Sequence, residues 1–356
     1  MKSGTKWFVL FLLLILVGGG IITSGLLIWN RSQKEKGIPL DREKTAQLKK
    51  QLDENLRSIF IFDPDTSYRL KPSFQGLRHN SSSLPHSTNS RGILGGEEIN
   101  PDPSVRKILF LGDSVTYGEE VPYEDVFVSR MAVEAGDSFQ LLNAGCPGWS
   151  THQELTAYRK YFADLPIDTV VIVFALNDLL RFEWVWRDDN SFQMSAELRG
   201  LGGLAHSKLT ARALKKIRGR FWNNLELRPL ANLNNTCLNS YLLPKWIEWL
   251  NRIQPAISEI VENKHLIIVA VPARPQLETL NLGGDPDTVL LPQRQLEKFC
   301  SENGIEYVNL VEAFKEESGG YEIDFFLRGG VGLLHLSPDG HERVAGFLFP
   351  IIFPEE

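Results

Sequence analysis

Residues 107–118, KILFLGDSVTYG, place a short apolar run directly before a polar turn bounded by glycines. Such a run is typical of a buried strand in a parallel sheet. Four more runs of this kind follow, at 139–143 (FQLLN), 169–175 (TVVIVFA), 265–271 (HLIIVAV) and 306–310 (EYVNL). Helical stretches alternate with them. The pattern predicts an α/β fold, a three-layer α/β/α sandwich around a parallel sheet of about five strands.

Polar turns follow four of these predicted strands. Ser114, in the turn Gly112-Asp113-Ser114, follows the first, and the segment 143–148 (NAGCPG) follows the second. Asn177 follows the third, and His335, in the run HLSPDGH, follows the fifth. Because the carboxyl ends of parallel strands meet at one edge of a sheet, where ligands bind, we expect these residues to form one site.

The four segments, in this order, resemble the four sequence blocks of the SGNH (GDSL-like) hydrolase superfamily. The resemblance covers about residues 105–350 and implies a flavodoxin-like sheet and a serine esterase. It matches Ser114 to the nucleophile, Gly148 to the oxyanion glycine, Asn177 to the asparagine of the third block and His335 to the histidine of the last. The pieces DPDTSYRLKPS (63–73) and TNSRGILG (88–95) also look like the segment that precedes the hydrolase domain in membrane-anchored bacterial members.

The residue types fit this chemistry independently of the resemblance. Attack on an acyl carbonyl needs an activated hydroxyl, a base and donors aimed at the developing oxyanion. The backbone N–H groups of Ser114 and Gly148 and the side-chain amide of Asn177 would supply three donors. We expect Asp113 to fix the turn by hydrogen bonds, and Cys146 to be a small packing residue.

The acid of the expected triad is missing from its usual place. The superfamily has an aspartate three residues before the histidine, where this chain has Gly332. Three interpretations remain: a Ser-His dyad oriented by a backbone carbonyl, a displaced acid such as Asp324 or Asp339, or a domain that has lost activity and only binds. We favour the dyad and, if an acid serves, Asp324, because the glycines that follow it would let the chain fold back toward His335.

The chain divides into three predicted parts. Residues 1–36 contain an uncharged run from Trp7 to Trp29, longer than the roughly 20 apolar residues that span a bilayer, which predicts a transmembrane anchor. A cleavable signal peptide is the alternative, but no A-x-A-like site follows. Residues 37–104 read as a juxtamembrane helix and a loop-rich segment with short edge strands. Residues 105–356 form the hydrolase-like domain, with a helical cap inserted at about 180–262.

These features together predict a serine esterase acting on a cell-envelope or glycan O-acyl ester. The alternatives are an O-acyltransferase on a glycan and a catalytically silent, membrane-tethered binding or assembly module. The resemblance places the catalytic domain outside the cytoplasm, although the positive charges that flank the span count against it. Three cysteines without metal-ligand spacing indicate no zinc site, and a net charge of −6 indicates no nucleic-acid partner. Ester hydrolysis through an acyl-serine intermediate would need neither a metal nor an organic cofactor.

Overall fold

The computed structural model describes residues 59–78, 84–179, 184–186, 192–194, 248–327 and 335–354. The predicted anchor and juxtamembrane helix lie outside these ranges, as do most of the cap insertion and Gly332. Among the described helices, none combines the length and the apolar character that crossing a bilayer requires.

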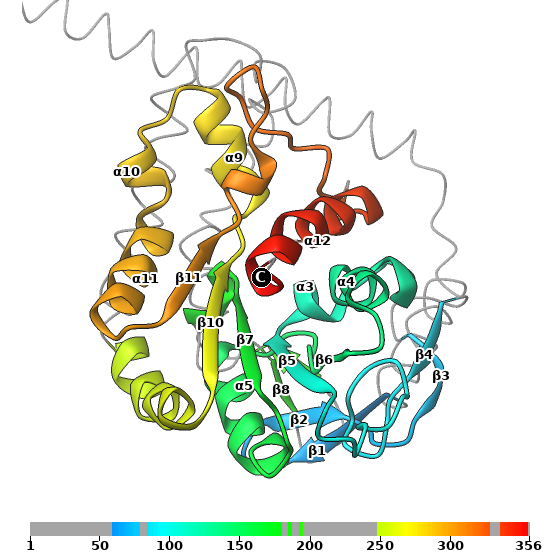
Figure 1. Ribbon diagram of the computed structural model, residues 1–356. Helices are drawn as coiled ribbons and strands as arrows, with labels where there is room; N and C mark the ends of the chain where they lie inside the picture. The colour runs from blue at the N-terminus through cyan, green and yellow to red at the C-terminus, as the bar shows by residue number, and fades with distance from the viewer. Residues whose placement is uncertain are drawn as a thin grey trace, which may run out of the picture. The chain divides into compact units, whose positions relative to one another are not determined.

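The centre of the fold is a five-stranded parallel sheet, which confirms the predicted sheet and its five strands (Figure 1). Its spatial order is β11-β10-β7-β5-β6. The strands span β5 (Arg106–Gly112), β6 (Phe139–Asn143), β7 (Thr169–Phe174), β10 (His265–Ala270) and β11 (Glu306–Asn309). Ile108 of β5 pairs with Leu141 on one side and Thr169 on the other, so β5 lies between the strands that follow it.

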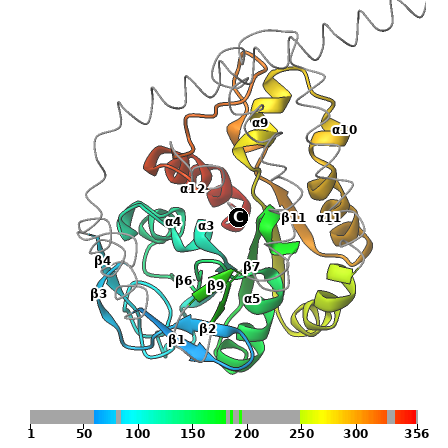
Figure 2. The same ribbon diagram turned by 180° about the vertical axis from the view of Figure 1, so that it is seen from behind.

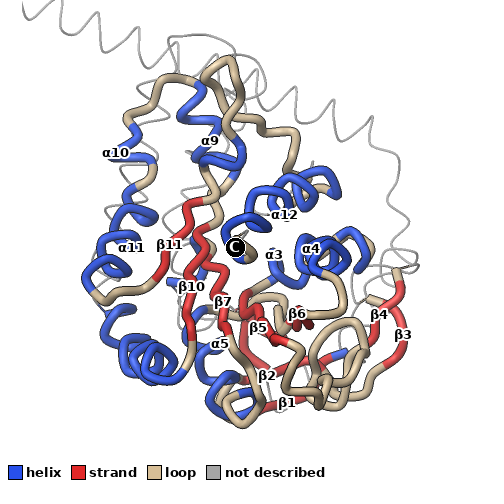
Figure 3. The backbone as a smooth tube through the Cα atoms, in the orientation of Figure 1, coloured by secondary structure: helices blue, strands red, loops and turns tan. Residues whose placement is uncertain are grey.

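Helices cover both faces of the sheet because side chains alternate along each strand. Leu109 and Leu111 of β5 enter one core cluster, while Ile108 and Phe110 enter the other. The first cluster includes side chains of α5 (Thr151–Ala157), the helix over residues 248–263 and α11 (Leu291–Glu302). The second includes α4 (Phe127–Ala135), α9 (Arg274–Asn281), α10 (Pro286–Val289) and α12 (Pro338–Ile352). Figure 3 shows the helices on either side of the strands.

Short helical turns complete the described helices. They are α3 (Ser114–Tyr117), the π-helix η2 (Tyr158–Phe162), and the 3-10 turns η1 (Tyr123–Asp125), η3 (Leu176–Leu179) and η5 (Glu312–Phe314).

The segment before the sheet carries four short strands, where the sequence indicated loops with short edge strands. β1 (Phe60–Asp63) pairs with β2 (Ser67–Leu70), and β3 (Gln75–Leu77) pairs with β4 (Pro85–Ser87), both antiparallel. Phe60, Tyr68 and Leu70 are buried in the same core cluster as α5. This segment therefore packs as part of the same body as the sheet (Figure 2). A further antiparallel pair, β8 (Trp184–Trp186) and β9 (Phe192–Met194), belongs to the insertion.

The strand order creates a switch point beside β5. The chain passes from β5 to β6 on one side and then returns to β7 on the other. Loops that leave the carboxyl ends of strands at such a point diverge and form a crevice. Ser114, Gly148 and Asn177 follow β5, β6 and β7, so the fold brings the predicted site residues to this edge.

Candidate active site

The turn that carries Ser114 is held tightly between strand and helix. β5 ends at Gly112 and α3 begins at Ser114. The Asp113 carboxylate accepts a hydrogen bond from the Val115 N–H at 2.8 Å, so Asp113 caps the helix and fixes the turn as the sequence predicted. A Cβ added to Gly112 would lie 2.0 Å from Thr116 Oγ1, which leaves room only for glycine at this junction.

A hydrogen bond joins Ser114 to His335. The two side chains, 221 residues apart in sequence, meet with Ser114 Oγ 2.9 Å from His335 Nε2. Both residues are buried. The backbone of His335 is fixed because the Leu327 N–H donates to its carbonyl at 2.9 Å, while the Ser337 N–H donates to the Phe325 carbonyl at 2.8 Å. The pair has the separation expected of a nucleophile and its base.

Two glutamates flank the imidazole. Glu120 Oε2 lies 3.5 Å from His335 Nδ1, and Glu119 Oε2 lies 3.8 Å from Nε2. Their side chains are 35% and 13% exposed, respectively, so Glu120 is the more strongly screened by solvent. Nδ1 is the ring nitrogen that does not face Ser114. Glu120 therefore stands where the acid of a catalytic triad acts.

The backbone at Glu120 adopts a conformation that residues with side chains rarely take. Its φ is 71°, in the left-handed region, which costs on the order of 1 kcal/mol or more. Neighbouring contacts hold the turn: the buried Arg78 guanidinium donates to the Gly118 carbonyl, and the Glu119 N–H donates to the Ser114 carbonyl at 3.0 Å. Strain of this kind collects at functional sites, and here it directs the Glu120 carboxylate toward His335.

The structure does not bring the sequence-based candidate acids to the imidazole. Asp324 is exposed, and Asp339 is exposed in the first turn of α12. In the described part of the chain, the carboxylates within ion-pair distance of His335 are those of Glu119 and Glu120. Asp324 directly precedes residues 325–327, whose backbone forms hydrogen bonds with the backbone of His335 and Ser337. Asp324 and Asp339 flank the histidine in the chain, whereas the two glutamates that lie near the imidazole follow the turn that carries Ser114.

The loop after β6 lies against the nucleophile turn. Asn143 Nδ2 donates to the Thr116 carbonyl at 2.7 Å, and the Cys146 N–H donates to the Gly112 carbonyl at 3.0 Å. Across the described ranges, neither the Ser114 N–H nor the Gly148 N–H has a hydrogen-bond partner, although both residues are buried. Buried N–H groups are normally paired, so these two are donors that remain available to a ligand.

Asn177 lies in η3, directly after β7 and at the same edge of the sheet. Its side chain is outside the part of the chain that the structure describes. The neighbouring Asp178 closes the turn, because its Oδ2 accepts a hydrogen bond from the Ala175 N–H at 2.7 Å.

The sequence profile of one known protein family matches the region that contains all four predicted site residues. The profile of the GDSL-like Lipase/Acylhydrolase family matches residues 110–343, which include Ser114, Gly148, Asn177 and His335. The chain belongs to the GDSL-like lipase/acylhydrolase family. It is accordingly an ester hydrolase, in agreement with the resemblance to SGNH hydrolases.

Solved structures of GDSL-like proteins resemble this one at low sequence identity. The lipase/acylhydrolase from Enterococcus faecalis is 18% identical, with a TM-score of 0.39, over 71% of this chain and 100% of that chain. The acetyl xylan esterase AlAXEase is 14% identical, with a TM-score of 0.42, over 69% and 100%. A lipolytic G-D-S-L family protein from Veillonella parvula DSM 2008 is 14% identical, with a TM-score of 0.40, over 70% and 100%. A comparison with curated protein sequences gives no match.

Cys146 is the cysteine that lies nearest to the proposed site in the sequence, in the loop after β6. No group of three or more His, Cys, Asp and Glu side chains is placed to hold a metal ion within the described ranges. Cys146 is buried in the loop after β6, and burial raises the pKa of its thiol well above the ordinary value. The thiol form is unreactive, which fits the predicted packing role.

A second acid, Glu154, is buried behind the nucleophile turn of the hydrolase. It lies in α5 and is fully buried, and neither carboxyl oxygen has a hydrogen-bond partner within the described residues. Burial, followed by the neighbouring Asp113 carboxyl, raises the pKa of Glu154 well above its ordinary value of 4.5. Glu154 is therefore protonated at a pH where an exposed glutamate is ionised.

Glu154→Gln should flatten the dependence of stability on pH. Above about pH 4.5 the unfolded chain releases a proton that the folded hydrolase keeps, so stability falls as pH rises, by up to about 1.4 kcal/mol per pH unit until the raised pKa is reached. Glutamine has no proton to release. Urea unfolding at about pH 6 and about pH 8 should show a smaller loss of free energy of unfolding for the variant than for wild type.

The exposed Glu134 of α4 offers a matched control, because Glu134→Gln should keep the wild-type slope. A wild-type slope in Glu154→Gln would show that Glu154 is ionised in the folded protein.

Proposed function

We propose that this hydrolase cleaves a carboxylic ester through an acyl-serine intermediate, with Ser114 as nucleophile, His335 as base and Glu120 as the acid that orients the base. One observation carries the proposal: His335 has Ser114 Oγ 2.9 Å from Nε2 and the Glu120 carboxylate 3.5 Å from Nδ1. A neutral imidazole has one donor nitrogen and one acceptor nitrogen. A carboxylate beside Nδ1 favours the proton there, which leaves Nε2 free to accept the serine proton.

In the first step, Ser114 Oγ forms a bond to the acyl carbon and its proton passes to His335 Nε2. The carbonyl π electrons move onto the carbonyl oxygen, which becomes an oxyanion. The imidazolium gains a positive charge, which the carboxylates of Glu120 and Glu119 stabilise. Glu119 is the better shielded of the two and adds to this effect, but it lies on the Nε2 side and does not orient the Nδ1 proton.

The oxyanion is stabilised by donors that are already in place. The N–H groups of Ser114 and Gly148, unpaired among the described residues, are the backbone donors that we assign. The family resemblance adds the side-chain amide of Asn177 as a third donor. Each such donor accounts for roughly 10²- to 10³-fold in kcat, because it acts on charge that develops only in the transition state.

The intermediate then collapses. The Nε2 proton passes to the leaving alkoxide as the ester C–O bond breaks, which gives an alcohol and an acyl-Ser114. A water molecule attacks the acyl carbon while Nε2 takes its proton, and a second collapse returns that proton to Ser114 and releases the carboxylic acid.

We further propose that the hydrolase is anchored by residues 7–29 and acts outside the cytoplasm on an O-acylated glycan or another cell-envelope ester. The proposal is supported by the uncharged apolar run and by the resemblance to anchored family members. The full chain should stay with membranes through carbonate extraction, and protease should reach its catalytic part once the envelope is opened. Full protection under those conditions would place the domain in the cytoplasm.

Short-chain nitrophenyl esters test the proposed chemistry. We expect a burst of nitrophenol equal to about one equivalent of enzyme, and an acyl mass increase on the peptide that contains Ser114. Products formed in the presence of added sugars separate two outcomes: free acid indicates the hydrolase, and acylated sugar indicates the O-acyltransferase. Absence of both turnover and adduct would contradict the proposal and favour a binding module.

A further inference from the structure

The proposed oxyanion donor Gly148 lies in a tight turn formed by residues 146–149. The Trp149 N–H donates to the Cys146 carbonyl at 3.1 Å, which closes the turn. Proline occupies its second position and glycine its third, where Gly148 has a φ of 73°. These are the marks of a type II β-turn, whose third residue needs a positive φ.

The central peptide of this turn determines the direction of the Gly148 N–H. Type I and type II turns differ mainly in the orientation of that peptide, which is reversed between them. The Pro147 carbonyl and the Gly148 N–H belong to the same planar trans unit, so they point in opposite directions. Whatever holds the Pro147 carbonyl therefore also holds the Gly148 N–H.

Tyr68 of β2 holds that carbonyl. Its hydroxyl donates to the Pro147 carbonyl at 2.9 Å, and its own backbone carbonyl accepts a hydrogen bond from Trp149 Nε1 at 2.9 Å. Tyr68 is 1% exposed, and its ring packs edge-to-face on Phe60, with ring centroids 5.3 Å apart. The buried Tyr68 thus forms hydrogen bonds with both the central peptide of the turn and its last residue, Trp149.

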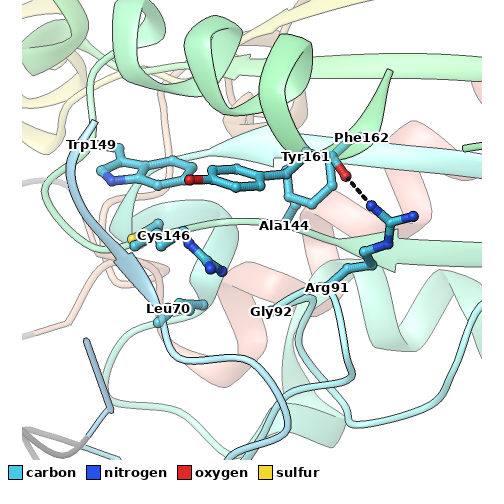
Figure 4. A pocket seen from close by; sticks show the side chains of 9 residues that line it. Leu70, Arg91, Gly92, Ala144, Cys146, Trp149, Tyr161 and Phe162 are labelled. Carbon is cyan, nitrogen blue, oxygen red and sulfur yellow. Dashed lines mark hydrogen bonds between the residues drawn. The ribbon is translucent and has the colours of Figure 1, made fainter. Parts of the chain in front are cut away.

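The same loop also lies close to other residues of the segment that precedes the sheet. A small pocket there is lined by Leu70 of β2, Gly92, Ala144, Cys146 and Trp149, among others (Figure 4). Together with Tyr68, these contacts place the loop against strands that precede the matched family region, residues 110–343. The loop conformation thus depends on residues outside that region.

We propose that Tyr68 is a positioning residue of the oxyanion hole, which rests on the proposed function of Gly148. By donating to the Pro147 carbonyl, the Tyr68 hydroxyl keeps the 146–149 turn in its type II form and so keeps the Gly148 N–H directed away from β2. Without the hydroxyl, the central peptide is free to reverse, and the donor is lost for part of the time. The β1–β2 hairpin then contributes to the oxyanion hole as well as to the core.

Tyr68→Phe in the full chain tests this role. The change removes one hydroxyl and keeps the ring, so we expect the melting temperature to change little. The kcat for a nitrophenyl ester should fall by about 10- to 100-fold, less than the loss of a whole donor, while KM stays within about twofold. The matched control is Tyr307→Phe, which removes a hydroxyl that donates to the Gln293 carbonyl at 3.0 Å beside β11; its kcat should not change.

Each outcome bears on the proposal when Ser114→Ala is measured in parallel. If Ser114→Ala is inactive and Tyr68→Phe keeps at least half of the wild-type kcat, the positioning role is refuted and the serine mechanism stands. An equal loss of kcat in Tyr68→Phe and Tyr307→Phe, or an effect on KM alone, also refutes it. If Ser114→Ala keeps its turnover, the proposed function fails, and the role of Tyr68 fails with it.

Discussion

Replacing Ser114 with alanine should lower the kcat for ester hydrolysis by roughly 10⁴- to 10⁶-fold. The reason is direct: Ser114 Oγ is the protein atom that bonds to the acyl carbon in the proposed mechanism, and alanine offers no replacement. His335→Ala should fall to about the same rate, because a hydroxyl without its base is a weak nucleophile. The double variant should be no slower than either single variant, since the two residues act as a unit.

Stability provides the control for this prediction. Losing one hydroxyl at the start of α3 creates almost no cavity, so the melting temperature of Ser114→Ala should stay close to wild type. The rate is measured with a nitrophenyl acetate assay on protein free of contaminating esterase. Turnover by folded Ser114→Ala at near the wild-type rate would exclude Ser114 as nucleophile.

Removing the Glu120 carboxylate should lower kcat by about 10²-fold. In a tightly bonded triad the loss reaches about 10⁴-fold through the wrong imidazole tautomer. Here the contact to Nδ1 is 3.5 Å and the Glu120 side chain is 35% exposed, so we expect a smaller effect. Glu120→Gln and Glu120→Ala should behave alike, because it is the charge that matters. The measurement is steady-state kcat and KM, with KM expected to remain near its wild-type value.

Neighbouring acids supply matched controls for Glu120. Glu119→Gln should cost less than Glu120→Gln, because Glu119 lies on the Nε2 side of the ring. Asp324→Asn and Asp339→Asn should leave kcat unchanged. Glu120→Gly is a further discriminating variant: glycine tolerates a φ of 71°, so the protein should be as stable as wild type or more so while it loses activity.

A second change tests whether Glu120 replaces the family's usual acid. Gly332→Asp places an aspartate three residues before the histidine, at the sequence position that it occupies in the superfamily. When it is added to Glu120→Ala, this change should raise kcat at least tenfold above that of Glu120→Ala alone. A kcat for Glu120→Gln within twofold of wild type would instead favour a Ser-His dyad. A large loss of kcat in Asp324→Asn would indicate that Asp324 is the acid that orients His335.

Much of the fold could be predicted from the chain because its signals are local. Short apolar runs such as 169–175 form buried parallel strands wherever helices flank them, and β7 follows that run closely. Ser114 could be assigned to the carboxyl edge of the sheet because it follows β5 closely, and His335 could be paired with it through the family resemblance. That edge is determined by strand direction alone, without knowledge of any side-chain contact.

Glu120 and Tyr68 were missed because their roles depend on contacts between distant segments. Glu120 is 215 residues from His335, and its direction depends on a left-handed backbone that no sequence pattern requires of a glutamate. The available signal was weak: two adjacent acids directly after Gly118. Tyr68 reaches Pro147 across 79 residues, from a stretch whose Pro, Ser, Asn and Gly content indicated loops. Its burial follows from the packing of β2 in the core, which the sequence did not predict.

Fluorophosphonate labelling tests the central claim, that His335 and Glu120 activate Ser114, most directly. The probe reacts with an activated serine, and peptide mapping identifies the residue that it modifies. We predict that wild type is labelled on Ser114 alone, that Glu120→Ala is labelled there about 10²-fold more slowly, and that His335→Ala is not labelled. Labelling of another residue in wild type, or labelling of Ser114 in His335→Ala at the wild-type rate, would contradict the account.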